Sequence, residues 1–248
     1  MEDNNTSIQC KNCGTTIHAK FCPHCGQKTS VQRITLRDTL LDFFDTIFSV
    51  DAPLFYTIKM LCLHPGTMLQ EFLAGKRKRY YKPVAFFVLM TIIYLLVRSL
   101  IGYDPMLASA VKVSGDSNEL MVQTQKFMFE NINTFLFFFV FWFGILLKIF
   151  FYKRYSIAES WTIGFYLVGF YIILSTLNMF LAHYISYDLQ FVIVAVIGIY
   201  FVFALLSLFQ RPKWLITLKT IPVYMISIGL YIFSAFTCSL LIVYLKNR

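Results

Sequence analysis

The stretch SWTIGFYLVGFYIILSTLNMFLA at residues 160–182 decides the fold of this chain, because it contains no Asp, Glu, Lys or Arg. A helix needs about 20 apolar residues to cross a hydrocarbon core roughly 30 Å thick. Inside lipid, every backbone donor and acceptor must be satisfied within the protein, and a helix achieves this alone. The stretch therefore predicts a transmembrane helix.

Further blocks without those four charged residue types lie at 83–97, 131–147, 189–209 and 220–245. The first two reach spanning length if Arg98 and Lys148 extend their aliphatic stems to the interface. We expect an all-α integral membrane protein with about five transmembrane helices near 83–102, 131–151, 158–182, 189–209 and 220–245. Pro222 is expected in the first turn of the last helix, where proline is tolerated.

The composition agrees with a membrane-embedded chain. Of 248 residues, 58% are hydrophobic and 14% are charged, against about 45–50% and about 25% in an ordinary soluble domain. The 27 Phe and 15 Tyr residues are the opposite of the polar composition that keeps a chain disordered. These numbers exclude a typical water-soluble globule and an intrinsically disordered protein.

Two CxxCG motifs near the N-terminus, CKNCG at 10–14 and CPHCG at 22–26, give the most specific functional signal. In a reducing cytosol, paired CxxC units are typical of metal ligands and not of disulfides. Four thiolates at this spacing can surround one zinc ion as a tetrahedron, and Gly14 and Gly26 permit the positive φ of such turns. We therefore predict a cytosolic zinc ribbon over residues 1–30, in which a structural zinc supplies the folding energy; its ligands are Cys10, Cys13, Cys22 and Cys25.

Residues 31–82 are expected to form amphipathic juxtamembrane helices. An apolar stripe runs through 35–48, and the opposite face carries Asp38, Asp42 and Asp45. A helix on anionic lipid usually has basic residues on that face, so this one is expected to dock on protein, with its acids solvated and not binding a divalent ion. A second apolar stretch, 54–63, is too short to span and ends at a His-Pro-Gly turn. A short helix over 67–74, closed by Gly75, is expected next.

A basic cluster adjoins the first expected transmembrane helix at Pro83. Each basic residue near an anionic leaflet contributes about 1 kcal/mol, so we expect the cluster to bind anionic lipid headgroups and not nucleic acid. We also hypothesise that part of it faces the acidic stripe of residues 38–45. The cluster consists of Lys76, Arg77, Lys78, Arg79 and Lys82.

Basic residues alternate between the expected loops. They are concentrated before residue 83, at 148–154 and at 211–219, whereas the intervening loops are poorer: 103–130 contains Lys112 and Lys126 offset by four acidic residues, and 183–188 contains no Lys or Arg. By the positive-inside rule this alternation predicts a cytoplasmic N-terminus and an external C-terminus. The polar first ten residues also lack the basic region and apolar core of a cleavable signal peptide.

The motif order resembles a bacterial family of uncharacterised multi-spanning membrane proteins that carry an N-terminal zinc ribbon. The resemblance rests on CxxCG, CPxCGQ ending at Gln27, a His-Pro-Gly turn, and Gly-Lys-Arg-x-x-Tyr-x-x-Pro at 75–83. It covers residues 10 to about 95 and implies the bacterial inner membrane, but no activity, since the family is catalogued as a domain of unknown function. The plan also resembles Yip-type trafficking proteins in topology alone.

No nucleophile elbow, HExxH, P-loop or dinucleotide-binding motif occurs, so an enzyme is not expected. Two hypotheses remain. The first is a membrane-embedded interaction or scaffold protein whose ribbon and juxtamembrane helices bind a protein partner. The second is a small permease or channel with the ribbon as a regulatory cap, for which Glu159 and Asn178 would have to face a common water-filled cavity.

Overall fold

The computed structural model describes residues 8–28, 53–103, 119–152, 154–186, 192–209 and 213–247. The amphipathic helix expected over 35–48 lies outside these residues. Its three aspartates lie outside them as well, so the hypothesised contact between these aspartates and the basic cluster stays a prediction.

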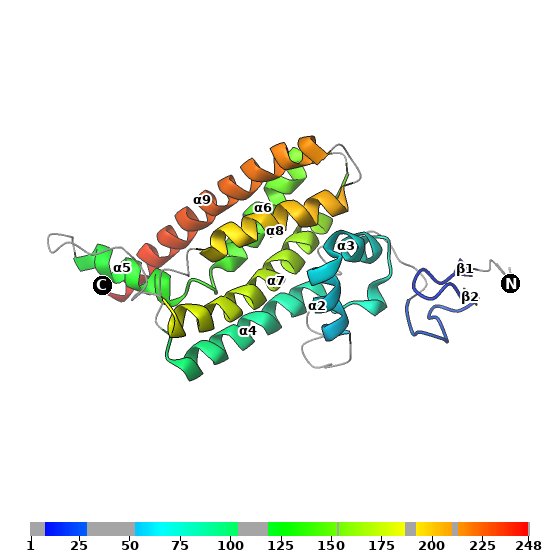
Figure 1. The fold of residues 1–248 in the computed structure, drawn as a ribbon, viewed down its shortest axis with the longest axis horizontal. Coiled ribbons are helices and arrows are strands. Elements are labelled where there is room, and N and C mark those ends of the chain that lie inside the picture. The colour runs from blue at the N-terminus through cyan, green and yellow to red at the C-terminus, as the bar shows by residue number, and fades with distance from the viewer. Residues whose placement is uncertain are drawn as a thin grey trace.

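The N-terminal unit contains two very short antiparallel strands, β1 (Ile8–Gln9) and β2 (Thr16–Ile17). Ile8 lies opposite Ile17, and Gln9 lies opposite Thr16. The unit projects beyond one end of the helical bundle (Figure 1). Such short strands cannot bury a large core, and among the described residues the core of this unit consists only of Cys10, Ile17 and Cys22, with Cys25 packed against it.

A helical hairpin follows, formed by α2 (Leu54–Leu63) and α3 (Pro65–Leu73). As predicted, the first of these helices ends at Leu63. The second begins at Pro65, two residues earlier than expected, because proline is well suited to the first position of a helix. A single 3₁₀ turn, η1 (Arg77–Arg79), then contains most of the basic cluster.

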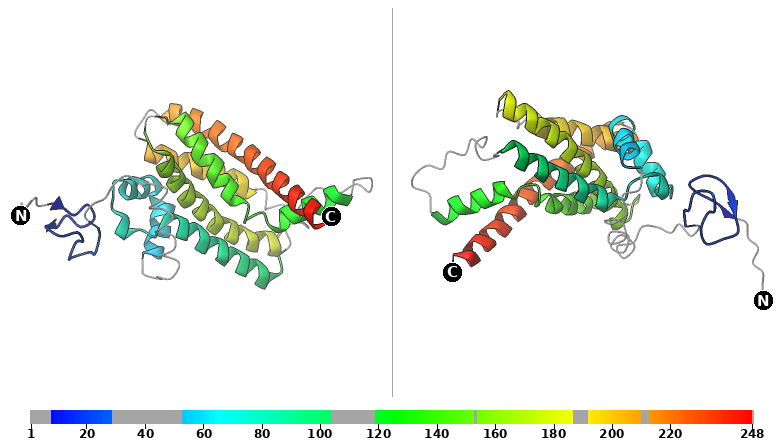
Figure 2. Two further views of the ribbon diagram at one scale, coloured as in Figure 1. Left: turned by 180° about the vertical axis from the view of Figure 1, so that it is seen from behind. Right: turned by 90° about the horizontal axis from the view of Figure 1, so that it is seen from below.

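The bundle consists of α4 (Pro83–Ile101), α6 (Leu136–Phe150), α7 (Ile157–Tyr184), α8 (Val192–Leu208) and α9 (Lys213–Lys246). Figures 1 and 2 show these helices side by side, with the α2–α3 hairpin at the end nearer to the ribbon. Each helix overlaps one of the five apolar blocks. The helical class is therefore confirmed.

Within the residues that the structure describes, three helices are long and apolar enough to cross a membrane: Arg77–Ile101, Ile157–Tyr184 and Trp214–Lys246. The helices α6 and α8 are apolar but shorter, so a count of five spans is not confirmed. We expected the helix α6 to begin near residue 131. Residues 131–135 form turns instead, so α6 is shorter than predicted.

Two expectations for this region are wrong. Residues 103–130 were expected to be a loop, but α5 (Glu119–Glu130) lies there and packs against α9. Its mixed polar sequence forms no charge-free block, which is why hydropathy misses it. In addition, α9 begins at Lys213, so Pro222 lies inside the helix and not in its first turn. There it removes the backbone bond to the Leu218 carbonyl.

The core is centred on α7, which contacts α4, α6 and α8. Tyr166 is fully buried, and its hydroxyl donates to the Tyr81 carbonyl at 2.5 Å. Gly169 allows close approach, because a Cβ there would lie 2.6 Å from the Phe86 ring. The bundle and the segment just before α4 are thus fixed to each other.

The α2–α3 hairpin is attached to α8 by polar contacts. The Gly66 amide donates to Ser207 Oγ at 3.0 Å, and Gln70 Nε2 donates to the Leu208 carbonyl at 2.8 Å. A Cβ on Gly66 would lie 2.2 Å from the Ser207 backbone carbon. Glycine is therefore required here for the two helices to approach so closely.

Candidate metal centre and its contact with the basic turn

The two CxxCG segments fold into equivalent turns. In the first, the Gly14 amide donates to the Cys10 carbonyl at 2.8 Å; in the second, the Gly26 amide donates to the Cys22 carbonyl at 2.8 Å. Gly14 has φ 77° and Gly26 has φ 69°, as the spacing predicts. The second turn is closed by the Cys22 amide, which donates to the Gln27 carbonyl at 2.8 Å.

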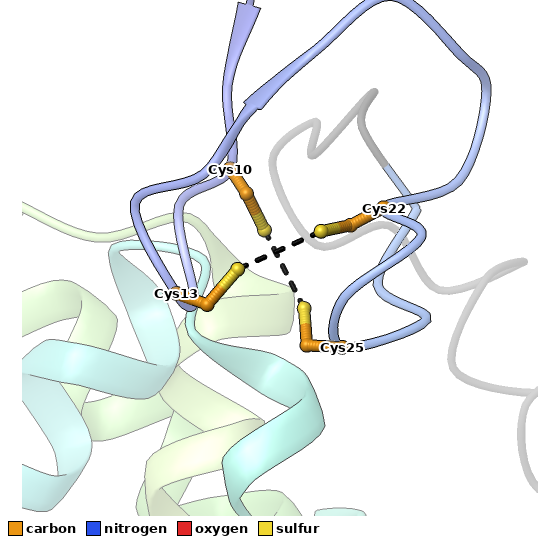
Figure 3. A group of neighbouring side chains, drawn as sticks. All are labelled: Cys10, Cys13, Cys22 and Cys25. Atoms are coloured by element: carbon orange, nitrogen blue, oxygen red, sulfur yellow. Dashed lines mark hydrogen bonds between the residues drawn. The ribbon is translucent and has the colours of Figure 1, made fainter.

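These turns bring four sulfur atoms to one point (Figure 3). The Sγ atoms of Cys10 and Cys25 are 3.6 Å apart, as are those of Cys13 and Cys22. All four lie within 4.8 Å of one another. A tetrahedral ion with metal–sulfur bonds of about 2.3 Å requires sulfur atoms about 3.8 Å apart. The residues present therefore fit a four-coordinate metal ion.

The local surroundings shift the pKa values of two of the thiols in opposite directions. Thr15 Oγ1 lies 3.3 Å from Cys13 Sγ, and this hydrogen bond lowers the pKa of Cys13 to about 6. Burial raises the pKa of Cys25 to about 11. A bound cation deprotonates its coordinating thiols outright, so metal binding must release protons from Cys25 in particular.

The ribbon contacts the basic turn through one buried side chain, Gln27, which is 6% exposed. Its Nε2 donates to the Gly75 carbonyl at 2.7 Å, and its Oε1 accepts from the Lys78 amide at 3.3 Å. The same residue closes the second cysteine turn with its backbone carbonyl. The metal centre and the basic turn thus share one residue.

Glu71 organises the basic turn from α3. Its carboxylate accepts from Lys76 Nζ at 2.9 Å and from the Tyr80 hydroxyl at 2.5 Å, and Arg79 lies 3.6 Å away. The Tyr80 hydrogen bond, followed by that from Lys76, lowers the pKa of Glu71. The Arg79 guanidinium also lies 4.8 Å from the centre of the Tyr56 ring.

The basic residues predicted to bind lipid thus fall into two groups in the structure. Lys76 and Arg79 are oriented by Glu71, whereas Lys78 has an exposed side chain beside the ribbon. Sequence reasoning missed Gln27 and Glu71 as organising residues. A signal for Glu71 existed, because it is the only acidic residue in the sequence from 53 to 103.

The residues suggested for transport do not meet. Glu159 and Ser156 form a capping box at the start of α7, in which the Ser156 amide donates to Glu159 Oε2 at 2.7 Å. Asn178 lies on the same helix, and nineteen residues at 1.5 Å each place it about 28 Å further along. The two side chains therefore lie far apart along the helix and do not form one site.

Comparison with known proteins adds one finding. Residues 51–95 match a family described as protein of unknown function (DUF3667). No curated protein and no solved structure matches the chain. The matched segment contains α2, α3, the basic turn and the first part of α4. It therefore includes Glu71 and the surface on which Gln27 docks, but not the four cysteines of the ribbon.

Proposed function

We propose that the chain is a non-enzymatic membrane scaffold whose ribbon and basic turn form a single cytosolic docking unit for a protein partner. The observation that carries the proposal is Gln27. Its backbone closes a cysteine turn and its side chain binds Gly75 and Lys78. A ribbon held against the basic turn by these hydrogen bonds presents a defined surface at the membrane, as a scaffold requires.

The proposed ion is zinc in a structural role. Four cysteine sulfurs form a soft donor set that suits Zn²⁺, and they fill its tetrahedral shell without leaving a position for water. When bound, zinc supplies the folding energy that the two-residue strands cannot. A catalytic zinc would need an open position, so the donor set favours a structural site.

We further propose five membrane spans in a bacterial inner membrane, with the N-terminus in the cytoplasm. Basic residues at the ribbon end of the bundle support this orientation. Lys219 Nζ donates to the Phe150 carbonyl at 3.1 Å, and Arg154 lies 5.8 Å from the Phe209 ring centre. The starts of α7 and α9 therefore meet the ends of α6 and α8 at one basic end.

At that end the basic cluster is proposed to bind anionic lipid headgroups. Lys78 is exposed, while Lys76 and Arg79 are held in fixed positions by Glu71. Orienting the cations in advance reduces the entropy lost on binding. Nucleic acid is not part of the proposal, because the cluster adjoins the first membrane helix.

The test is in-cell crosslinking with mass spectrometry in native membranes. A Cys22→Ser, Cys25→Ser variant is compared with wild type at equal expression, and a Cys62→Ser, Cys238→Ser variant serves as the matched control. A partner set that disappears only with the ribbon cysteines supports the scaffold. Identical partner sets in all three proteins contradict it.

A small permease is the second candidate, and one observation favours it. Residues 131–135 interrupt the helical structure between α5 and α6. Within them, Asn133 is 4% exposed and its Nδ2 lacks a hydrogen-bond partner among the described residues. Broken helices line binding sites in many transporters. Flux of glycerol and of amino acids into liposomes, compared between wild type and Asn133→Leu, tests this candidate.

A further inference from the structure

One face of α2 is exposed and largely apolar although the helix packs on the bundle. Phe55 is 85% exposed and Leu63 is 54% exposed. Lys59 and Cys62 are exposed between them. These positions follow one another at i, i+4, i+7 and i+8, so they share one face of the helix.

Two hydrogen bonds fix the depth of α2 along the bundle. The Tyr81 amide, two residues before α4 begins, donates to Thr57 Oγ1 at 2.9 Å. Tyr200, in the middle of α8, donates from its hydroxyl to the Leu61 carbonyl at 3.0 Å. The helix α2 therefore lies beside the bundle and not beyond its end: its first half is level with the start of α4, and its second half is level with the middle of α8.

The start of α3 lies nearer to the basic end. Gly66 contacts Ser207, which follows Tyr200 by seven residues, or about 10 Å along α8. The chain thus lies beside the middle of α8 near the end of α2 and reaches the basic end of α8 after the His64–Gly66 turn. A hairpin of this kind dips beside the bundle instead of projecting from it.

We propose that α2 is a re-entrant helix whose exposed face, Phe55, Cys62 and Leu63, inserts into the lipid leaflet on the basic side. The proposal rests on the proposed placement of α8 in the membrane. Lipid fits this face better than a soluble partner does, because the face lies at the depth of the spans. Lys59 extends its stem over the apolar surface so that its ammonium group reaches the headgroups.

The test places the photocrosslinking residue p-benzoylphenylalanine at Phe55 in the full chain, reconstituted in phosphatidylethanolamine–phosphatidylglycerol vesicles with radiolabelled lipid. Two matched positions serve as controls. Phe21 is an exposed aromatic residue on the ribbon, and Phe233 is an exposed aromatic residue on the candidate span α9. All three substitutions replace an exposed ring by a larger aromatic group, so folding is preserved.

We expect the Phe55 position to give at least tenfold more lipid adduct than Phe21 and a yield comparable to Phe233. A Phe55 yield as low as that of Phe21, with Phe233 reactive, overturns the re-entrant helix but leaves the membrane-spanning proposal intact. Low yields at both Phe55 and Phe233 overturn both. A Phe55 adduct to a second copy of the chain, instead of lipid, also overturns the inference.

Discussion

Replacing Gln27 by Ala separates the docking of the ribbon from the formation of the metal centre. The substitution removes the bonds to the Gly75 carbonyl and the Lys78 amide, which measure 2.7 Å and 3.3 Å. It leaves the Gln27 backbone carbonyl, which closes the cysteine turn, unchanged. Docking should therefore weaken while the metal site persists.

The magnitude follows from the two bonds. Each contributes about 0.5–1.5 kcal/mol net, and a buried carbonyl left without a donor costs about 1–3 kcal/mol. Because Gly75 is buried, docking should weaken by about 2–3 kcal/mol. Since about 1.4 kcal/mol corresponds to a factor of ten, the docked-to-undocked ratio should fall roughly 30- to 100-fold.

Amide hydrogen exchange followed by mass spectrometry measures this ratio, with the peptide over residues 75–82 as the reporter. Exchange within this peptide should accelerate in Gln27→Ala, most of all at the Lys78 amide, whose acceptor the substitution removes, and should remain unchanged in Lys28→Ala, an exposed neighbour. Metal content should stay equal in all three proteins. Unchanged exchange in Gln27→Ala, with the metal retained, would refute the docking contact.

Three further outcomes are expected. Gly66→Ala places a Cβ 2.2 Å from the Ser207 backbone and should lower the free energy of unfolding in detergent by at least about 2 kcal/mol, whereas Gly229→Ala, with no atom within 4 Å, should not. Because its partners lower the pKa of Glu71, its stabilisation is complete above the unfolded value of about 4.3 and is lost as the pH falls through the lower folded value. Protection of the basic-turn amides from exchange should therefore fall over the same pH range in wild type, and Glu71→Gln should abolish this pH dependence. Elemental analysis should find one zinc per chain in wild type and none in Cys22→Ser, and a full metal complement in the variant contradicts the site.

The sequence was most informative where the determinants are local. The cysteine spacing and Gly14 and Gly26 define turns of a few residues each, and the structure shows those turns. The apolar blocks likewise locate the helices of the bundle, because hydropathy is summed over neighbouring positions. Both signals need no knowledge of distant contacts.

The remainder depends on contacts between distant residues. Gln27 and Gly75 are 48 positions apart, so nothing near either residue in the sequence indicates their contact. Two helix predictions also failed. The helix α5 is too polar to give a hydropathy signal, and α9 extends beyond the apolar block, so Pro222 lies inside it. A helix end depends on tertiary packing as well as on local composition.

A continuous series of contacts connects the cysteines to the bundle. Cys22 bonds to Gln27, Gln27 bonds to Gly75 and Lys78, and Tyr81, three residues later, contacts Tyr166 in the core. Within this series the ribbon is joined to the basic turn by the two side-chain bonds of Gln27, whose loss we expect to cost about 2–3 kcal/mol. Loss of the metal should therefore weaken the docking of the ribbon on the basic turn by up to about 100-fold and leave the helices of the bundle folded. Under the scaffold proposal we therefore expect metal removal to weaken partner binding, while the amount of the chain in the membrane stays the same.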